Sequence, residues 1–397
     1  MTIDARRETA LPHTLLEEIA AGSVDRELNR ILPHQQVAAL DSERFGALRV
    51  PVEFGGPGAS TEQLITEVIR LAEADSNIAH LYRGHFGFVE SLRFQRRQIQ
   101  DAWYPRVLKG KTVGNASTEK GGNLLGTLNT TLSSVNGGWV INGEKFYSTG
   151  TIFSDYTRVS ASQDGGVEGR RFAVVPIDGE GVTVHDDWDG FGQKLTGTGT
   201  TVLQDVTIEE TSILNRVAGS HEAVHEAAFF QLYLLAVQVG IAKAAVRDAS
   251  ATLAKRTRTF NTSVSGAAFK QDPLIQQIVG RMSSKTFVAE SAVLETARIH
   301  DLALEASGSA IYDSEIAVEK AQITVPDLVL TVTQELFQTV GASATLRTKA
   351  LDRHWRNAQT IATHNPIVFR ARSIGDYEIN GTLPEGLSAI GEAKGPK

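Results

Sequence analysis

Three short stretches of the sequence carry side chains that can do chemistry. His221-Glu222-Ala223-Val224-His225 has the H-E-x-x-H spacing of a metal-binding helix. Asn115 and Ser117 place an amide and a hydroxyl two residues apart, a pair that can meet the donor and acceptor edge of a heteroaromatic ligand. His364 stands in a His-Asn-Pro triplet, and an imidazole can take up or release a proton near neutral pH. A buried histidine that is merely hydrogen-bonded in the core is the alternative for His364.

The H-E-x-x-H pattern is a weak basis for zinc chemistry. A catalytic zinc needs a third protein ligand and an open coordination position. Asp248 lies on the same predicted helix and too far along it to close such a site. The pattern also stands at the start of that helix, where the Glu222 carboxylate stabilises the helix dipole. We therefore expect no metal site, and loss of activity on adding a chelator would contradict this expectation.

The periodicity of apolar residues divides the chain into three parts. Helical spacing runs from about residue 10 to 109 and is broken at 51–58 by Pro and Gly, after which Ser60 offers an N-cap. Short alternating stretches rich in Gly, Thr and Ser follow between 113 and 206. Helical spacing then returns at about 221–256, 273–306, 312–341 and 344–361. We predict an α+β protein with an N-terminal helical domain (1–112), a central antiparallel, β-barrel-like domain (113–218) and a C-terminal four-helix bundle (219–397).

Composition excludes several classes of function. The 397 residues are 41% hydrophobic and 21% charged, which is typical of a globular protein, and the net charge of −7 speaks against a nucleic-acid or anionic-membrane partner. A cytoplasmic location is the default expectation. There is no cysteine and there are only two methionines. This scarcity of sulfur is either compositional drift or a mark of a protein made during sulfur starvation, and expression measured after sulfate withdrawal would separate the two.

The stretch from Trp139 to Gly150, with its Ile-Asn-Gly-Glu-Lys-Phe-Tyr-Ser-Thr-Gly core, resembles the central strand motif of the acyl-CoA dehydrogenase superfamily. The turn at 51–58 and the segment at 191–200 resemble further motifs of the same superfamily, in the same order, so that the likeness covers nearly the whole chain. The resemblance implies a flavin that lies along this strand. It also implies flavin-contacting roles for a set of residues, which are Asn115, Ser117, Phe146, Trp188, Arg258 (phosphate), Gln338 (adenosine part, in FAD-dependent members) and Thr149 (near the reactive edge).

Several of these residues also have a simpler structural interpretation. Asn115 and Ser117 also fit a turn of small polar residues, Trp188 fits a core tryptophan, and basic residues near Arg258 stabilise the C-terminal end of a helix. In the Gln338 segment, Ala342 stands where the superfamily has its second Gly, which favours FMN over FAD.

The C-terminal segment points to one branch of the superfamily. Acyl-CoA dehydrogenases commonly carry a catalytic glutamate in a loop after the last long helix, but residues 361–366 contain no carboxylate. Residues 352–366 resemble instead the end of the dibenzothiophene monooxygenase-like, flavin-dependent monooxygenases. This likeness implies that His364 faces the flavin C4a position and that His85 lies in the same pocket.

The resemblance therefore implies a two-component monooxygenase. It would receive reduced FMN from a separate NAD(P)H-dependent flavin reductase, because the sequence has no G-x-G-x-x-G nicotinamide motif. It would use O2 through a C4a-hydroperoxyflavin to oxygenate a small apolar, organosulfur substrate, and it would assemble as a homotetramer. Two alternatives stay open: an acyl-CoA dehydrogenase whose base has moved, and a non-catalytic flavin-binding homologue.

Overall fold

The computed structural model describes residues 11–120, 128–135, 138–163, 170–217, 219–257 and 268–386. Its N-terminal part is helical, as predicted. Ser60 caps α5 in a capping box with Gln63, and the Asp75 carboxylate caps α6 by accepting from the Asn77 N–H. The helices of this part are α2 (His13–Ala21), α3 (Ser23–Asn29), α4 (His34–Ser42), α5 (Thr61–Ala74), α6 (Ser76–Leu81), α7 (Arg83–Leu92) and α8 (Arg97–Leu108).

The described strands form one sheet in the order β6-β7-β3-β2-β4-β5-β8, with β1 added beside β4. The prediction of a purely antiparallel domain was wrong, because β1 and β2 both pair with β4 in parallel. The sheet path is also open at β6 and β8 among these strands, so it is not a closed barrel. The strands are β1 (Val113–Ala116), β2 (Thr131–Val135), β3 (Gly138–Lys145), β4 (Tyr156–Gln163), β5 (Arg170–Pro176), β6 (Val182–Val184), β7 (Thr201–Ile208) and β8 (Ile213–Leu214).

The predicted hairpin is present, since β2 pairs with β3 in antiparallel register from Thr131 opposite Asn142 to Val135 opposite Gly138. The turn residues Asn136 and Gly137 lie outside the described part of the chain. The hairpin runs toward the residue pair Ser148 and Thr149, which lies beyond the end of β3. The strand motif therefore delivers its hydroxyl-rich end to one edge of the sheet.

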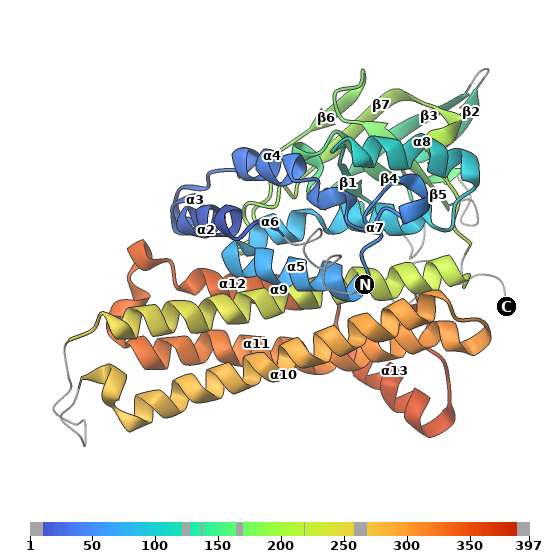
Figure 1. Cartoon of the computed structure of the whole chain (residues 1–397). Helices are drawn as coiled ribbons and strands as arrows, with labels where there is room; N and C mark the ends of the chain where they lie inside the picture. The colour runs from blue at the N-terminus through green and yellow to red at the C-terminus, as the bar shows by residue number, and fades with distance from the viewer. Residues whose placement is uncertain are drawn as a thin grey trace.

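The C-terminal part contains three long helices that lie side by side, α9 (His221–Ala254), α10 (Pro273–Leu304) and α11 (Asp313–Val340) (Figure 1). The expected fourth long helix is replaced by α12 (Asp352–Ala362) and α13 (Ile367–Asn380), both of which pack on α11. The helix predicted from residue 344 begins only at Asp352, after two short 3-10 turns, and α13 was not predicted. The four-helix bundle is thus three long helices with two short ones.

Helix α9 joins the N-terminal and C-terminal parts. It packs against α5 on one side and against α10 and α11 on the other. The approach to α5 is close at Gly240, where an added Cβ would lie 2.4 Å from the Ala72 Cβ. Helix α9 is long and apolar enough to span a bilayer, with a mean hydropathy of 1.6 over its best window, but 83% of that window is buried inside the protein. Its apolar surface is therefore core.

Candidate active site

Five of the residues expected around a flavin come together at one edge of the sheet. The Asn115 N–H donates to the Thr149 carbonyl over 3.3 Å, and the Phe146 N–H donates to the Thr118 carbonyl over 2.9 Å. The Ser117 hydroxyl donates to the Asn115 side-chain oxygen over 3.0 Å. Strand β1 and the segment that follows β3 therefore lie side by side, and the predicted amide and hydroxyl partners are neighbours in space.

An aromatic group lies beside these polar residues. The ring centroids of Phe146 and Trp188 are 6.4 Å apart, and those of Tyr147 and Trp188 are 6.0 Å apart. Tyr147 is 47% exposed and Trp188 is half-buried, so Trp188 is not a fully enclosed core residue. A surface with open aromatic faces next to amide and hydroxyl groups suits a flavin ring, which has an apolar benzenoid end and a polar pyrimidine end.

The Thr149 hydroxyl belongs to a row of threonines. Its Oγ1 is 2.8 Å from the Thr198 Oγ1, which is 2.7 Å from the Thr196 Oγ1. The backbone is tied to the same loop, because the Gly150 N–H donates to the Thr196 carbonyl. Thr149 is thus held in one orientation at the edge of the site, which fits the predicted hydrogen-bonding role.

Helices α6 and α7 close one side of this edge. A Cβ added at Gly84 would lie 2.7 Å from the Asn115 Cβ, and one added at Gly150 would lie 2.4 Å from the Leu81 carbonyl oxygen. These close approaches need glycine. They bring α6 and α7, with His80 and Arg83, close to the part of the site that contains Asn115 and Thr149.

His364 lies just after α12 and faces Arg83, with 3.5 Å between the His364 Nε2 and the Arg83 Nη1. Many protein atoms surround His364, although the residue as a whole is exposed. Burial first, and then the charges of Arg83 and His80, hold the pKa of His364 well below its usual value. The imidazole is therefore neutral at pH 7, and one ring nitrogen can accept a hydrogen bond while the other donates.

The pocket beside His364 has about 270 Å³ of empty space, part of it open solvent. Helices α9 and α11 and the segment between α12 and α13 form its wall. It combines apolar side chains with four amides, and its lining includes Leu234, Leu235, Ile361, Gln231, Gln238, Gln322 and Asn365. Apolar walls with a few polar groups are typical of a small-molecule site.

His80 is a site residue that the sequence did not single out. Its Nδ1 lies 3.1 Å from the Gln193 Oε1, and burial followed by the charge of Arg83 lowers its pKa to about 4. Gln193 is itself fixed, since its backbone N–H donates to the Asn357 side chain over 2.6 Å. Nothing in the sequence distinguishes His80 from His85 as the histidine that reaches the site.

His85 lies in the core instead. Its Nε2 is 2.9 Å from the Gly46 carbonyl oxygen, and its Nδ1 accepts from the Val113 N–H over 3.1 Å. Both ring nitrogens are thus occupied by backbone groups, and the ring is 1% exposed. Burial lowers the pKa of His85 to about 4. The structure therefore does not support the predicted catalytic role, because no ring nitrogen is left for a substrate or a cofactor.

Two predicted cofactor residues remain, and the structure places one of them. Arg258 lies outside the described residues. Gln338 is exposed near the C-terminal end of α11. The neighbouring Arg256 donates to the Val340 carbonyl and lies over the Phe269 ring, with its Cζ 3.9 Å from the centroid. This cation stabilises the dipole of α11, whereas the alternative for the basic segment concerned the helix that precedes it, α9.

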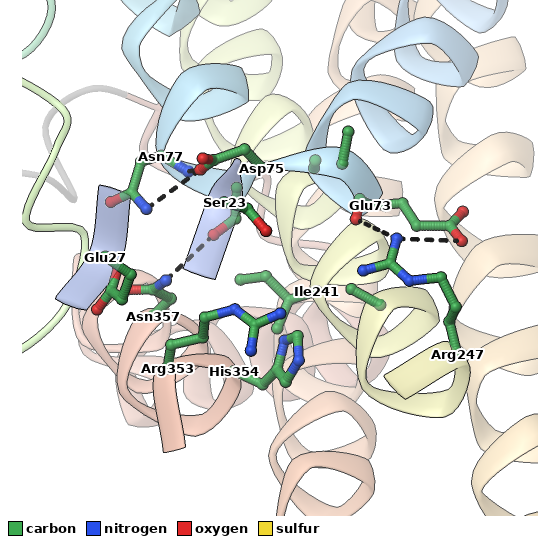
Figure 2. A pocket seen from close by; sticks show the side chains of 14 residues that line it. Ser23, Glu27, Glu73, Asp75, Asn77, Ile241, Arg247, Arg353, His354 and Asn357 are labelled. Atoms are coloured by element: carbon green, nitrogen blue, oxygen red, sulfur yellow. Dashed lines mark hydrogen bonds and ion pairs between the residues drawn. The ribbon is translucent and has the colours of Figure 1, made fainter. Parts of the chain in front are cut away.

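A second, polar pocket holds α12 in place (Figure 2). Arg353, His354 and Asn357 of α12 point into it, and it has about 320 Å³ of empty space, part of it open solvent. The Asp248 carboxylate accepts from Arg353 over 2.6 Å and lies 2.9 Å from the His354 Nε2. Asn357 also accepts from Gln193, so α12 anchors both the loop that supports His80 and the segment that carries His364.

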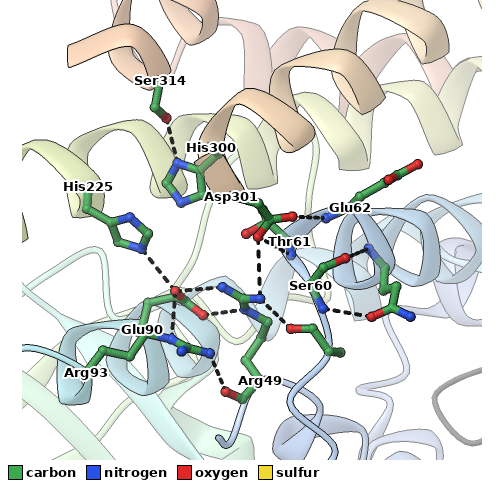
Figure 3. A network of polar contacts seen from close by, with 12 residues as sticks. Arg49, Ser60, Thr61, Glu62, Glu90, Arg93, His225, His300, Asp301 and Ser314 are labelled. Atoms are coloured by element: carbon green, nitrogen blue, oxygen red, sulfur yellow. Dashed lines mark hydrogen bonds and ion pairs between the residues drawn. The ribbon is translucent and has the colours of Figure 1, made fainter. Parts of the chain in front are cut away.

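The H-E-x-x-H residues take part in a buried polar network (Figure 3). The His225 Nε2 lies 3.0 Å from Glu90, which also accepts from Arg49 over 2.6 Å. The His221 Nε2 lies 3.0 Å from the Ala303 carbonyl oxygen. Within the described ranges no group of three or more His, Cys, Asp or Glu side chains is arranged to hold a metal ion. The two histidines are occupied by a carboxylate and a backbone carbonyl.

Comparison with known proteins establishes the family. The model of the acyl-CoA dehydrogenase middle domain matches residues 115–206, and that of the acyl-CoA dehydrogenase C-terminal domain matches residues 232–369. The chain belongs to the acyl-CoA dehydrogenase superfamily.

Its relatives narrow this assignment. The probable FMNH2-dependent monooxygenase SfnC of Pseudomonas putida is 26% identical over 96% of both chains. Dibenzothiophene monooxygenase of Mycolicibacterium goodii is 26% identical over 85% of both chains. The crystal structure of FMN-bound TdsC from Paenibacillus sp. A11-2 is 25% identical, has a TM-score of 0.88 and covers 96% of this chain and 99% of its own. The resemblance to the flavin-dependent monooxygenase branch is thereby confirmed.

Proposed function

We propose that this chain is the oxygenase component of a two-component, flavin-dependent monooxygenase. It takes reduced FMN from a separate NAD(P)H-dependent flavin reductase and uses O2 to oxygenate a small organosulfur compound. Relatives named FMNH2-dependent monooxygenase and dibenzothiophene monooxygenase over most of their length support this function.

One observation carries the proposal: the described residues that line the pocket include the neutral His364 and no carboxylate. The charged or titratable groups that act on His364 are Arg83 and His80. An acyl-CoA dehydrogenase needs a carboxylate there to remove a proton from its substrate. A neutral imidazole instead holds and delivers a proton, which suits the transfer of oxygen to a substrate and the release of the second oxygen atom as water.

The residues of the site fit FMN. Asn115, Ser117 and Thr149 supply an amide and two hydroxyls, and Phe146 and Trp188 supply aromatic faces, which together match the polar and apolar ends of the flavin ring. When bound in its reduced form, FMN supplies the electrons that activate O2. The apolar part of the pocket wall favours an apolar substrate, which on binding would displace water and so protect the reactive site from unproductive side reactions. The alanine at position 342 favours FMN over FAD.

The test is a reductase-coupled reaction under ¹⁸O2 with thioethers, sulfoxides and sulfinates as substrates. We expect one labelled oxygen atom in the product, and a fall of at least roughly a hundred-fold for His364→Ala, with more of the reducing power lost to peroxide. His13→Ala is the matched control, because His13 is 79% exposed. Bleaching of a tightly bound oxidised flavin by an acyl-CoA would support a dehydrogenase instead. If no labelled product forms and the His364→Ala substitution changes nothing, the protein is a non-catalytic homologue.

The oligomer and the location belong to the same proposal. Helix α10 exposes apolar side chains, with Phe287 70% and Leu302 74% exposed, and such an exposed apolar row is what a subunit interface buries. We propose a homotetramer in the cytoplasm, where NAD(P)H is available to the reductase. Light scattering on the protein and on Phe287→Glu tests the assembly, since the variant should shift to smaller species. Cell fractionation tests the location.

A further inference from the structure

Four amide side chains gather in the pocket beside His364. Gln231 and Gln238 stand about two turns apart on α9 and share one face of that helix, and Gln322 reaches Gln231 from α11. The fourth amide, Asn365, lies in the segment between α12 and α13. Gln231 is 5% exposed and Gln238 is 2% exposed, so these two amides belong to the interior of the protein.

Each of the four amides keeps a buried polar atom that no described residue pairs. The donors left over are the Gln231 Nε2 and the Asn365 Nδ2, and the acceptors left over are the Gln238 Oε1 and the Gln322 Oε1. The Gln322 Nε2 donates to the Gln231 Oε1 over 3.0 Å. Because every amide has a donor and an acceptor group, this pair leaves one of each whichever way the two amides are turned.

These polar atoms surround a space that can hold a small molecule. A buried amide without a partner destabilises the folded protein, and most buried polar atoms in proteins are hydrogen-bonded. The four amides line one pocket with about 270 Å³ of empty space, part of it open solvent. The arrangement becomes favourable when the occupant of the pocket supplies the missing donors and acceptors.

The rest of the lining limits the charge of that occupant. None of the described lining residues is Asp, Glu, Lys or Arg, and burial keeps the His364 imidazole neutral at pH 7 by lowering its pKa. An ionised group would lose its hydration there without gaining a counter-charge from the lining. A wholly apolar molecule would pack against Leu234, Leu235 and Ile361 but would leave the amides unpaired.

We propose that Gln231, Gln238, Gln322 and Asn365 determine substrate specificity by binding a neutral, carboxamide-like group on a small thioether. This inference rests on the proposed monooxygenase function and names the substrate class for it. The oxygen of a carboxamide can accept from the donors that are left over while its N–H groups donate to the acceptors. The apolar side chains of the pocket pack on the rest of the molecule.

The experiment compares four thioethers that differ in one group: 4-(methylthio)benzamide, its N,N-dimethyl amide, 4-(methylthio)benzoate and thioanisole. The first donates and accepts hydrogen bonds, the second only accepts, the third is an anion, and the last has no polar group. Calorimetry with the full-length protein and oxidised FMN gives Kd apart from turnover, and the reductase-coupled assay gives KM. We expect the wild type to bind the benzamide at least roughly ten-fold more tightly than each of the other three.

A substitution in the pocket separates hydrogen bonding from packing. Gln238→Leu keeps a side chain of similar size and removes the amide, so it should raise the Kd and the KM for the benzamide at least roughly ten-fold. The same values for thioanisole should stay within about two-fold of the wild type, because thioanisole makes no hydrogen bond to the amides. Gln35→Leu, at an exposed glutamine of α4 that does not line the pocket, is the matched control.

The outcomes separate the two proposals. If thioanisole is bound and oxygenated as well as the benzamide, and Gln238→Leu changes neither, the amides hold only water and the specificity role is wrong while the monooxygenase function stands. If the benzoate binds most tightly, the pocket receives an anion and the inference is overturned. If the benzamide binds selectively but none of the four thioethers is oxygenated, the monooxygenase function itself is wrong. Should Gln238→Leu fail to fold, the order in which the wild type binds the four compounds decides the matter.

Discussion

Replacing His85 by alanine tests whether this histidine supports the fold or takes part in the reaction. The imidazole joins the Gly46 carbonyl to the Val113 N–H, and it thereby ties the N-terminal helical part to the first strand of the sheet. His85→Ala leaves both backbone groups buried without a partner. Each such group costs about 1–3 kcal/mol, and the lost ring adds a cavity, so we expect a fall of about 3–6 kcal/mol in the free energy of unfolding.

A second variant sharpens this prediction. A Cβ added at Gly46 would lie 2.5 Å from the His85 Nε2, so Gly46→Ala alone should also destabilise the protein. In the double variant the new methyl group enters the space that the ring has left. The combined cost should therefore be smaller than the sum of the two single costs by about 1 kcal/mol or more.

The assay is chemical denaturation followed by far-UV circular dichroism at a fixed protein concentration, together with turnover at a temperature where every variant is folded. We expect His85→Ala to keep turnover within roughly three-fold of the wild type while its denaturation midpoint falls. The reasoning fails if His85→Ala is as stable as the wild type but loses turnover by roughly a hundred-fold. It also fails if the two single costs are strictly additive.

Three further predictions follow from buried polar groups. Burial lowers the folded-state pKa values of His85 and His354 to about 4, so the unfolded chain binds protons that the folded chain does not. The contribution of these two neutral histidines to stability is therefore complete above about pH 6.5 and is lost as the pH falls toward 4. Denaturation midpoints that stay constant from pH 7.5 to 5 would contradict this prediction. Glu90→Gln leaves the buried guanidinium of Arg49 with the more distant Asp301 carboxylate, 3.7 Å away, and we expect a loss of about 3 kcal/mol in a urea titration, whereas no shift would show that the network is dispensable. Gln193→Ala removes the partner of the His80 ring and should lower turnover by roughly ten-fold, with little change in the affinity for reduced FMN. Unchanged turnover would rule out a role of Gln193 in positioning His80.

Local signals in the sequence predicted those parts of the fold that depend on local chemistry. The Ser60 N-cap and the β2–β3 hairpin depend on short-range hydrogen bonds and on alternation, and both are present. The parallel pairings of β1 and β2 with β4 connect residues that are far apart in the sequence, and no local pattern indicates the direction of such pairings. The end of the bundle was mispredicted for a similar reason, because apolar spacing does not show that the chain bends at Pro366 and starts α13.

The residues of the site also divide into those that a local sequence motif indicates and those that it does not. Asn115, Ser117, Phe146 and Thr149 stand in motifs whose spacing resembles that of the superfamily, and the structure brings them together. Arg83 has no such motif. Its place opposite His364 depends on the packing of α7 against α9, which cannot be seen in a single sequence.

His80 and His85 lie on different helices and reach different neighbours. His80 lies near the end of α6 and contacts Gln193, whereas Arg83 and His85 are two residues apart on α7 and point to opposite sides of that helix. Arg83 therefore faces His364, and His85 turns toward Gly46 and Val113. Burial, and after it the charge of Arg83, lowers the pKa of both His80 and His364, so that Arg83 is the charged member of these three at pH 7. Burial and the guanidinium thus act together to keep both imidazoles neutral, and so able to accept a proton during the reaction.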